Sequence, residues 1–208
     1  MKLVDMQVKE YLDVLKSDAP APGGGSVSAL AGAQGVGLFM MVADLTIGKE
    51  KYADFQEVCL SAKEKGMTLY TSLFEGIDKD TEAFNLVSAA FKMPKATDEE
   101  KAARSAAIAA GTLVATEVPF TTMQYCMEGL KIAESLVGHS NPNAASDLGV
   151  AALNLLAGVR GAWLNVRINL PGVKDAEKKE YFEKTGSEIH EEAEKIANKI
   201  YSQILAEL

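Results

Sequence analysis

The sequence predicts an all-α protein that folds as a single-domain helical bundle. Apolar residues recur at steps of three and four along most of the 208 residues, as they do in amphipathic helices. No segment gives a convincing strand pattern, in which apolar and polar residues alternate. No linker or change of composition divides the chain, so residues 1–208 are expected to form one domain.

The first half of the chain predicts a short helix and then a buried one. Val8, Tyr11, Leu12 and Leu15 fall on one face of a short amphipathic helix. The breaker cluster at residues 19–26 ends this helix, and its last residue, Ser26, is expected to cap the next one. Residues 27–43 are uncharged and rich in small side chains. About 17 residues is the lower limit for crossing a bilayer, so we predict a buried central helix rather than a membrane span.

The middle of the chain predicts two long helical stretches. The first, a helix or a helix pair, runs from about residue 52 to Phe91 and is broken at residues 93–96, which include a proline. Thr97 and Glu100 have the spacing of a capping box, so a new helix is expected to begin there. Pro119 is expected to kink or split that helix.

The last third predicts a second small-residue central helix and a surface helix. Gly138 ends the preceding helix, and residues 139–143 form a loop. Residues 148–170 are again apolar and small, and the last 30 or so alternate isoleucine and alanine with charged residues at helical spacing. Small, nearly uncharged helices need covering, so a homodimer that buries them is expected.

Composition excludes several classes of partner. Asp and Glu number 29 against 21 Lys and Arg, for a net charge of −8, which argues against nucleic acid or an anionic membrane as a partner. Two cysteines and two histidines lie far apart, so no metal site is expected. Unpaired thiols and a charged N-terminus, unlike a signal peptide, favour a cytoplasmic location.

Asp80 is the candidate catalytic residue. Apolar side chains at Tyr70, Leu73, Ile77, Phe84, Val87 and Phe91 trace one helical stripe, and its missing member is position 80. A carboxylate in an apolar seam costs several kcal/mol unless it is paired. Either a Lys, an Arg or a helix terminus pairs with it as a structural charge, or the protein uses it. Asp78 lies off the stripe and is expected to face solvent.

The other candidates each have a structural alternative. The glycines Gly23, Gly24 and Gly25 precede a helix N-terminus, where backbone N–H groups suit an anion or a carbonyl, but a tight turn explains them equally well. Lys49 follows the central helix, where a cation interacts favourably with the helix dipole even without a ligand. Ser146 and Asp147 suit a helix start.

Two asparagines are the last of the candidate site residues. Asn165 and Asn169 are spaced i, i+4 on one face of an apolar helix, with Arg167 turned away. They suit either the donors and acceptors of a heterocycle or a partner helix. His139 is a loop residue, and no Ser-His-Asp or Cys-His arrangement is supported by spacing.

Six motifs in order resemble those of the cyclodeaminase/cyclohydrolase family, which includes the C-terminal domain of formiminotransferase-cyclodeaminase and the stand-alone bacterial methenyltetrahydrofolate cyclohydrolases. The likeness runs from about Val8 to about Tyr201. The motifs are Ala-Pro-Gly-Gly-Gly-Ser (21–26), Leu-Thr-Ile-Gly-Lys (45–49), Asp-Thr-Glu-Ala-Phe (80–84), Glu-Val-Pro-Phe (117–120), Ser-Asp (146–147) and Asn-Val-Arg-Ile-Asn (165–169). The formiminotransferase half is missing, so the chain is expected to be the stand-alone form.

The resemblance implies an enzyme of one-carbon tetrahydrofolate metabolism that acts as a cyclohydrolase, a cyclodeaminase or both, without a metal or an organic cofactor. It implies that Asp80 is the catalytic acid and base and that the folate binds near the glycine-rich loop and Phe84. The further substrate-binding candidates are Ser26, Ser146 and Asp147. Lys49, or less favourably Arg160 or Arg167, would meet the polyglutamate tail, and Asn165 and Asn169 would hold the pterin. The alternative is a non-catalytic helical interaction module of the same fold, in which Asp80 is only a paired charge.

Overall fold

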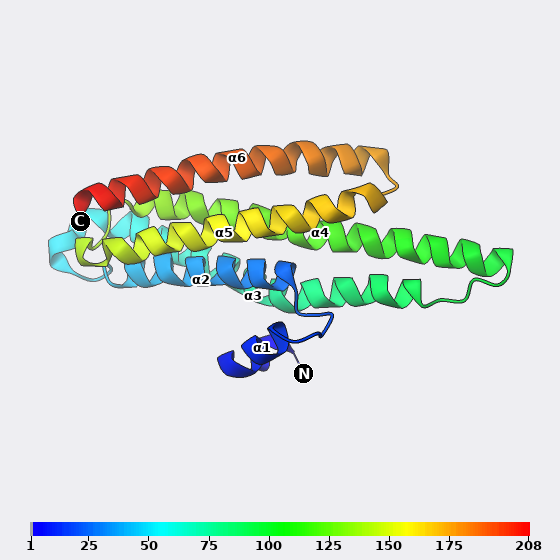
Figure 1. Ribbon diagram of the computed structural model, residues 1–208. Helices are drawn as coiled ribbons and strands as arrows, with labels where there is room; N and C mark the ends of the chain where they lie inside the picture. The colour runs from blue at the N-terminus through cyan, green and yellow to red at the C-terminus, as the bar shows by residue number, and fades with distance from the viewer. Residues whose placement is uncertain (1) are drawn as a thin grey trace.

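A computed structural model describes residues 2–208, which form α-helices and short 3-10 helices without a strand (Figure 1). The α-helices are α1 (Val8–Leu15), α2 (Gly24–Asp44), α3 (Gln56–Phe91), α4 (Asp98–Leu136), α5 (Ala145–Asn169) and α6 (Ala176–Glu207). The 3-10 helices are η1 (Leu3–Asp5), η2 (Glu50–Phe55), η3 (Pro142–Ala144) and η4 (Leu170–Gly172). The predicted all-α class and single-domain bundle are confirmed.

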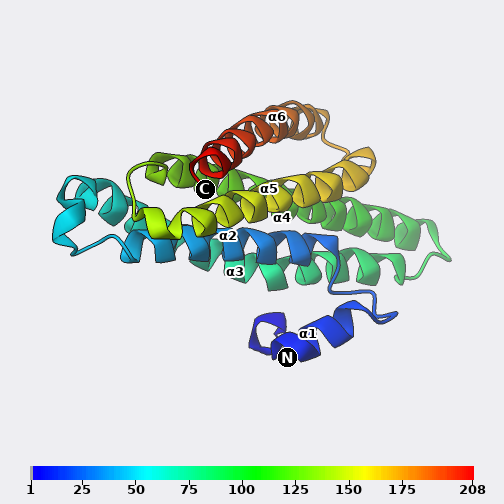
Figure 2. The same ribbon diagram turned by 60° about the vertical axis from the view of Figure 1, so that its left-hand side comes forward.

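The long helices lie nearly alongside one another, with α2 and α5 side by side in one layer (Figures 1 and 2). α3 and α4 pack against them, α6 covers α4 and α5, and α1 lies on the far side beside the N-terminal half of α2. The uncharged run at residues 27–43 falls within α2, as predicted. By length and composition α2 and α4 are each able to span a bilayer, but the most apolar window of α2 is 56% buried inside the bundle.

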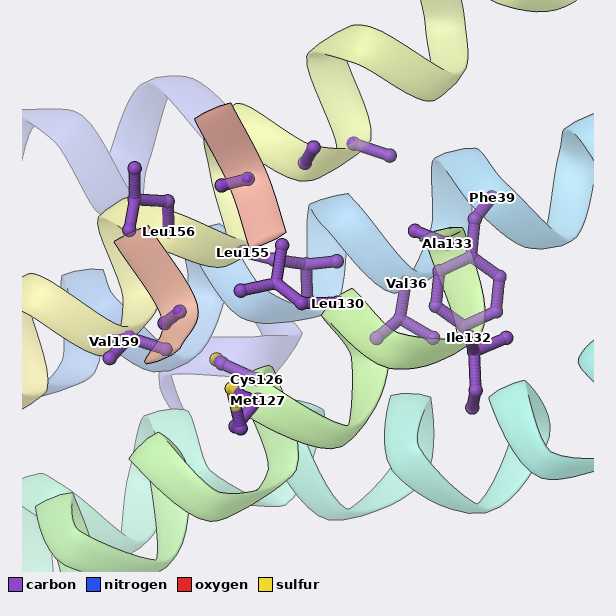
Figure 3. Close-up of a cluster of buried hydrophobic side chains, with 14 of the residues drawn as sticks. Val36, Phe39, Cys126, Met127, Leu130, Ile132, Ala133, Leu155, Leu156 and Val159 are labelled. Carbon is purple, nitrogen blue, oxygen red and sulfur yellow. The ribbon is translucent and has the colours of Figure 1, made fainter. Parts of the chain in front are cut away.

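Small residues let the central helices approach closely. A Cβ at Gly35 of α2 would come within 2.6 Å of the Leu155 side chain and 2.8 Å of the Ala151 carbonyl on α5. Larger side chains then fill the space toward α4 (Figure 3). Leu130 and Leu155 are fully buried there, each worth about 1.5–3 kcal/mol in transfer free energy. The core residues labelled in Figure 3 are Val36, Phe39, Cys126, Met127, Leu130, Ile132, Ala133, Leu155, Leu156 and Val159.

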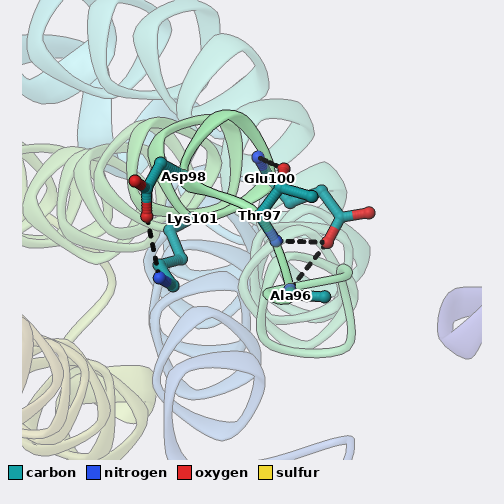
Figure 4. Close-up of polar contacts among 5 residues, drawn as sticks. All are labelled: Ala96, Thr97, Asp98, Glu100 and Lys101. Atoms are coloured by element: carbon teal, nitrogen blue, oxygen red, sulfur yellow. Dashed lines mark hydrogen bonds and ion pairs between the residues drawn. The ribbon is translucent and has the colours of Figure 1, made fainter.

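The predicted capping box at the start of α4 is confirmed. The Glu100 N–H donates to Oγ1 of Thr97 at 3.2 Å, and the Thr97 N–H donates to Oε2 of Glu100 at 3.2 Å (Figure 4). The same carboxylate accepts from the Ala96 N–H at 2.7 Å, and Lys101 pairs with Asp98 at 2.8 Å. These contacts fix the sharp reversal that lets α4 run back along α3.

The predicted cap of α2 is wrong, and so is a split of α4 at Pro119. Gly23, and not Ser26, is the N-cap of α2, so Ser26 lies inside the first turn. Pro119 does not split α4, which continues as one helix from Asp98 to Leu136. Packing on both sides of α4 compensates for the backbone hydrogen bond that a proline removes.

The predicted stripe on α3 is buried only in part. Leu73 and Ile77 are buried in the core, while Tyr70, Phe84 and Phe91 are 38–56% exposed. The C-terminal half of α3 buries alanines, such as Ala83 and Ala90, against α4 instead. The Asp78 side chain is half-buried rather than in solvent, and its Oδ1 accepts the Leu3 N–H at 2.6 Å.

Candidate active site

Asp80 lies on α3 where the N-terminus of α2 meets it. The backbone N–H of Ser26 donates to Oδ2 of Asp80 at 2.9 Å, and the Ser26 hydroxyl lies 3.1 Å from the same oxygen. That hydroxyl also lies 2.9 Å from the Ile77 carbonyl and 3.3 Å from the Thr81 hydroxyl. Ser26 therefore anchors one carboxylate oxygen from two directions.

The other carboxylate oxygen lies against glycine. A Cβ at position 25 would overlap Oδ1 of Asp80, so only glycine allows α2 to approach the carboxylate this closely. No hydrogen bond from residues 2–208 reaches Oδ1. The two oxygens thus differ: Oδ2 accepts hydrogen bonds from Ser26, and Oδ1 accepts none from the described residues.

Asp80 has no cationic partner in the described part of the chain. Burial raises the pKa of Asp80 above its ordinary value, and the hydrogen bonds from Ser26 oppose that rise. The sequence left open that a Lys, an Arg or a helix terminus pairs with Asp80 as a structural charge. Of these three, only a helix N-terminus, that of α2, faces the carboxylate. A carboxylate with a raised pKa and one free oxygen is suited to general acid and base chemistry.

Tyr11 of α1 packs beneath this carboxylate. Its hydroxyl is buried and has no hydrogen-bond partner among the described residues. Burial and the nearby charge of Asp80 both raise the pKa of Tyr11. The ring packs against Ala29 and Ile77, so α1 closes the side of the site that faces away from α5.

Asp80 opens into a cavity of about 310 Å³ between α2, α3, α4 and α5. The cavity is lined mainly by apolar side chains and small residues, with Asp80 and two amides as its polar side chains. Its lining residues are Pro20, Ala21, Gly23, Gly24, Asp80, Phe84, Val87, Ala115, Asn165, Ile168 and Asn169. An apolar cavity with a few convergent polar groups is typical of a small-molecule site.

Both predicted amides lie in this cavity. Nδ2 of Asn165 donates to the Gly161 carbonyl at 2.8 Å. A Cβ at Gly24 would come within 3.2 Å of the same nitrogen, so the glycine-rich loop and α5 meet closely at this point. The first-turn N–H groups of Gly24 and Gly25 have no helical acceptor. The cavity therefore combines backbone donors, two amides and one carboxylate.

The structure separates three predicted site residues from Asp80. α2 is 21 residues long, so its two ends lie about 30 Å apart at 1.5 Å per residue. Ser26 contacts Asp80 at one end, whereas Lys49 follows the other end, and Ser146 and Asp147 lie in the first turn of α5 near it. Within one chain, Lys49, Ser146 and Asp147 therefore do not line the cavity that holds Asp80, and their role in folate binding stays a prediction.

The two arginines considered for a ligand tail have partners within the chain. Arg160 donates through Nε to Oε1 of Glu194 on α6 at 2.9 Å. The guanidinium of Arg167 lies 5.5 Å from the ring centre of Trp163, as in a cation–π contact. Neither arginine lines the cavity.

Sequence reasoning missed several cavity residues. Val87 lies one turn beyond the motif residue Phe84, Ile168 lies between the two asparagines of its motif, and Pro20 and Ala21 belong to the breaker cluster. Ala115 had one usable signal, because it stands four residues before Pro119 and its carbonyl loses the helical donor there.

A larger hollow of about 650 Å³ lies between η2, α3 and α4, near His139. Its carboxylates Asp54 and Glu57 are exposed, and Glu134 pairs with Lys199 at 2.8 Å. No group of three or more His, Cys, Asp or Glu suited to a metal occurs in residues 2–208. The carboxylates of this hollow are exposed to solvent or paired with a lysine, so none of them resembles the buried carboxylate of Asp80. The cavity at Asp80 is therefore the better candidate for the active site.

In this all-α bundle, a partly buried carboxylate with a raised pKa lines a mainly apolar cavity. This combination is typical of an enzyme that acts on a small molecule by acid and base chemistry. The family model described as Formiminotransferase-cyclodeaminase matches residues 7–188. The chain belongs to this family, as the six motifs predicted.

Relatives and a solved structure agree with this assignment. A methenyltetrahydrofolate cyclohydrolase from Methylorubrum extorquens is 44% identical over 168 residues, which is 81% of each chain. A formimidoyltransferase-cyclodeaminase from Dictyostelium discoideum is 34% identical over 95% of this chain but only 36% of its own length. The crystal structure of formiminotetrahydrofolate cyclodeaminase from Thermotoga maritima superimposes with a TM-score of 0.78, at 29% identity, over 96% of this chain and 94% of that one.

Proposed function

We propose that the chain is an enzyme of one-carbon tetrahydrofolate metabolism, acting as a methenyltetrahydrofolate cyclohydrolase, a formimidoyltetrahydrofolate cyclodeaminase, or both. The observation that carries the proposal is Asp80, a carboxylate that lines a cavity and is anchored through Oδ2 alone. The names of the relatives supply the substrate class. The 44% identity over most of both chains favours the cyclohydrolase reaction.

In the cyclohydrolase reaction, water attacks the methenyl carbon of the 5,10-methenyl cation. Asp80 takes one water proton on Oδ1, which leaves a neutral carbinolamine. The bond from the carbon to N5 then breaks as Asp80 returns that proton to N5. The hydroxyl proton is lost to solvent as the carbonyl forms, and 10-formyltetrahydrofolate results. One carboxylate thus acts first as base and then as acid.

In the cyclodeaminase reaction, N10 attacks the carbon of the protonated formimino group on N5. Asp80 takes the N10 proton and passes it to the amino group, which leaves as ammonia, and the methenyl cation remains. The carboxylate also stabilises the positive charge in both reactions. Neither sequence of steps needs a metal or an organic cofactor, and we propose that the enzyme uses none.

The cavity offers contacts for the rest of the ligand. We propose that the glycine-rich loop at residues 23–25 meets the folate through backbone N–H groups, and that Phe84 packs against its rings. Asn165 and Asn169 supply polar contacts from α5. The glycines' lack of side chains and the direct lining by Phe84 and both amides support these roles.

We also propose that the enzyme is a cytoplasmic homodimer. α2 and α5 each leave an apolar stripe uncovered, and these neighbouring helices present the stripes together. Leu164 and Ile168 are 71% and 77% exposed, and Ile168 also lines the cavity. A second copy on this face would cover the stripes and border the site. The unpaired thiols Cys59 and Cys126 support a reducing compartment.

An assay of both folates with one preparation tests the proposal. A cyclohydrolase removes the near-ultraviolet absorbance of 5,10-methenyltetrahydrofolate faster than buffer does, and a cyclodeaminase generates it from 5-formiminotetrahydrofolate. Rates equal to the buffer rate for both substrates would overturn the proposal and favour the alternative, a non-catalytic helical module of the same fold.

A further inference from the structure

Pro119 leaves one backbone carbonyl of α4 without its helical donor. The residue is buried inside the helix and has no N–H to donate to the carbonyl of Ala115, four residues earlier. Ala115 lines the cavity that holds Asp80. The carbonyl that loses its helical donor therefore belongs to a residue of the candidate active site.

Asn169 takes the place of the missing donor. Its Nδ2 donates to the Ala115 carbonyl at 2.9 Å and to the Asn165 carbonyl at 3.0 Å. Both amide hydrogens are thus committed to backbone carbonyls from two helices. The opposite orientation would place Oδ1 against two carbonyl oxygens, so these contacts fix which end of the amide faces away from them.

The Asn169 amide has only its oxygen, Oδ1, left for a further hydrogen bond, and this oxygen is an acceptor. Asn169 lines the cavity, and no donor from residues 2–208 reaches its Oδ1. On the same wall, Asn165 commits Nδ2 to the Gly161 carbonyl. Asn165 keeps a second amide hydrogen, whereas Asn169 on the same wall has only its oxygen left to bond a ligand.

We propose that Pro119 is a positioning residue: by lacking an N–H it frees the Ala115 carbonyl to hold the Asn169 amide, whose Oδ1 accepts a hydrogen bond from a ring N–H or amino group of the ligand. This inference rests on the proposed function, since a reduced pterin carries such donors. It makes Asn169 selective for a donor group and gives Pro119, alone among the residues of its motif, a role in binding.

Substitution Pro119→Ala tests the proposal. Alanine restores the N–H, which bonds to the Ala115 carbonyl and competes with Asn169. Loss of one oriented hydrogen bond predicts a rise of about tenfold in KM, with kcat changed far less. The thermal midpoint is expected to hold or rise, because an interior helix proline has been removed. Weaker binding in a protein of equal or greater stability separates positioning from simple damage to the fold.

A double-mutant cycle provides the sharpest control. If Pro119 acts through Asn169, then Pro119→Ala added to Asn169→Ala raises KM no further than Asn169→Ala alone. Val118→Ala, the neighbouring substitution on α4 outside this cavity, is expected to leave KM unchanged. The proposal is overturned if Pro119→Ala leaves KM at the wild-type value, or if the two effects multiply.

Side-chain amide NMR distinguishes failure of this proposal from failure of the proposed function. Wild-type turnover of either folate decides the function by itself. In a wild-type protein without turnover, the Asn169 Nδ2 protons still report the contact: slow solvent exchange in the wild type that becomes fast in Pro119→Ala supports it. Equal exchange in both proteins contradicts it.

Discussion

The two carboxylate oxygens of Asp80 have different surroundings. Ser26 holds Oδ2 through a backbone and a side-chain donor, and Oδ1 accepts no hydrogen bond from residues 2–208. Anchoring one oxygen fixes the direction of the other, which general acid and base catalysis requires. Burial supplies the second requirement, because it raises the pKa of Asp80 toward the pH at which the enzyme works.

The raised pKa of Asp80 has a consequence for stability. Below the ordinary Asp value of 3.8, the carboxyl is protonated in both the folded and the unfolded chain. As pH rises, the unfolded chain loses its proton first, so the contribution of Asp80 to stability is lost up to the raised pKa of the folded state.

Substitution Asp80→Asn removes this ionisation and preserves the size of the side chain. The free energy of unfolding of the variant minus that of the wild type should therefore increase between about pH 3.5 and pH 7. Urea unfolding at the two pH values measures it, and other carboxylates cancel in the difference. A difference that falls with pH would mean that the fold prefers the ionised carboxylate, which is the opposite of what burial predicts.

The sequence predicted Asp80 but not its partners. A gap in an apolar series is visible in one helix, so position 80 could be identified. Its anchor, Ser26, lies 54 residues away, and only the crossing of α2 over α3 brings the two together. Asp78 shows the same limit, since its bond to the Leu3 N–H spans 75 residues and replaced the expected exposure to solvent.

At the scale of the element, the site depends on how closely the N-terminus of α2 approaches α3. Gly25 makes that approach possible, because a side chain there would overlap Oδ1 of Asp80. Helix propensity alone does not explain glycine at this position, since it costs about 1 kcal/mol relative to alanine. The close contact explains it.

Substitution Gly25→Ala should separate α2 from Asp80. The added methyl would break the Ser26 contacts and lower kcat/KM by about tenfold or more, as expected for a misplaced catalytic group. Steady-state kinetics measure the loss. Gly37→Ala in the middle of the same helix is the matched control, because its Cβ meets no atom within 4 Å. Equal activity in the two variants would show that the approach at Gly25 does not matter.

The start of α4 was more predictable than its continuity. Thr97 and Glu100 form a local signal, and the capping box followed. Pro119 is also a local signal, but its outcome depends on a distant residue, because Asn169 satisfies the carbonyl that the proline leaves free. Tertiary packing therefore overrode the predicted break.

At the scale of the whole molecule, the bundle has two ends with different residues. Asp80, the glycine-rich loop and both amides lie at one end, and Lys49, Ser146 and Asp147 lie toward the other. The motifs follow one another along the sequence, but α2, with 21 residues, places the motif after it about 30 Å from the motif before it. Order in sequence thus predicted the family and could not predict which residues meet.

The proposed dimer makes a testable claim about the uncovered face of α2 and α5. Wild-type protein at micromolar concentration should scatter light as a dimer. Leu153→Glu combined with Leu164→Glu places charges on two exposed leucines of α5 and should yield a monomer. Leu205→Glu, at an equally exposed leucine on α6, should stay dimeric. A wild-type monomer, or a dimer insensitive to the α5 charges, would contradict the proposed face.

The central claim is that Asp80 carries the proton, and turnover by Asp80→Asn tests it most directly. The amide keeps the size and an acceptor for Ser26 but cannot shuttle a proton, so kcat for methenyltetrahydrofolate should fall by about 10²–10⁴-fold. The thermal midpoint should hold or rise. Asp78→Asn, which keeps an acceptor for the Leu3 N–H, should turn over normally. An Asp80→Asn protein that unfolds early yet turns over at the wild-type rate would make Asp80 a structural charge and contradict its catalytic role.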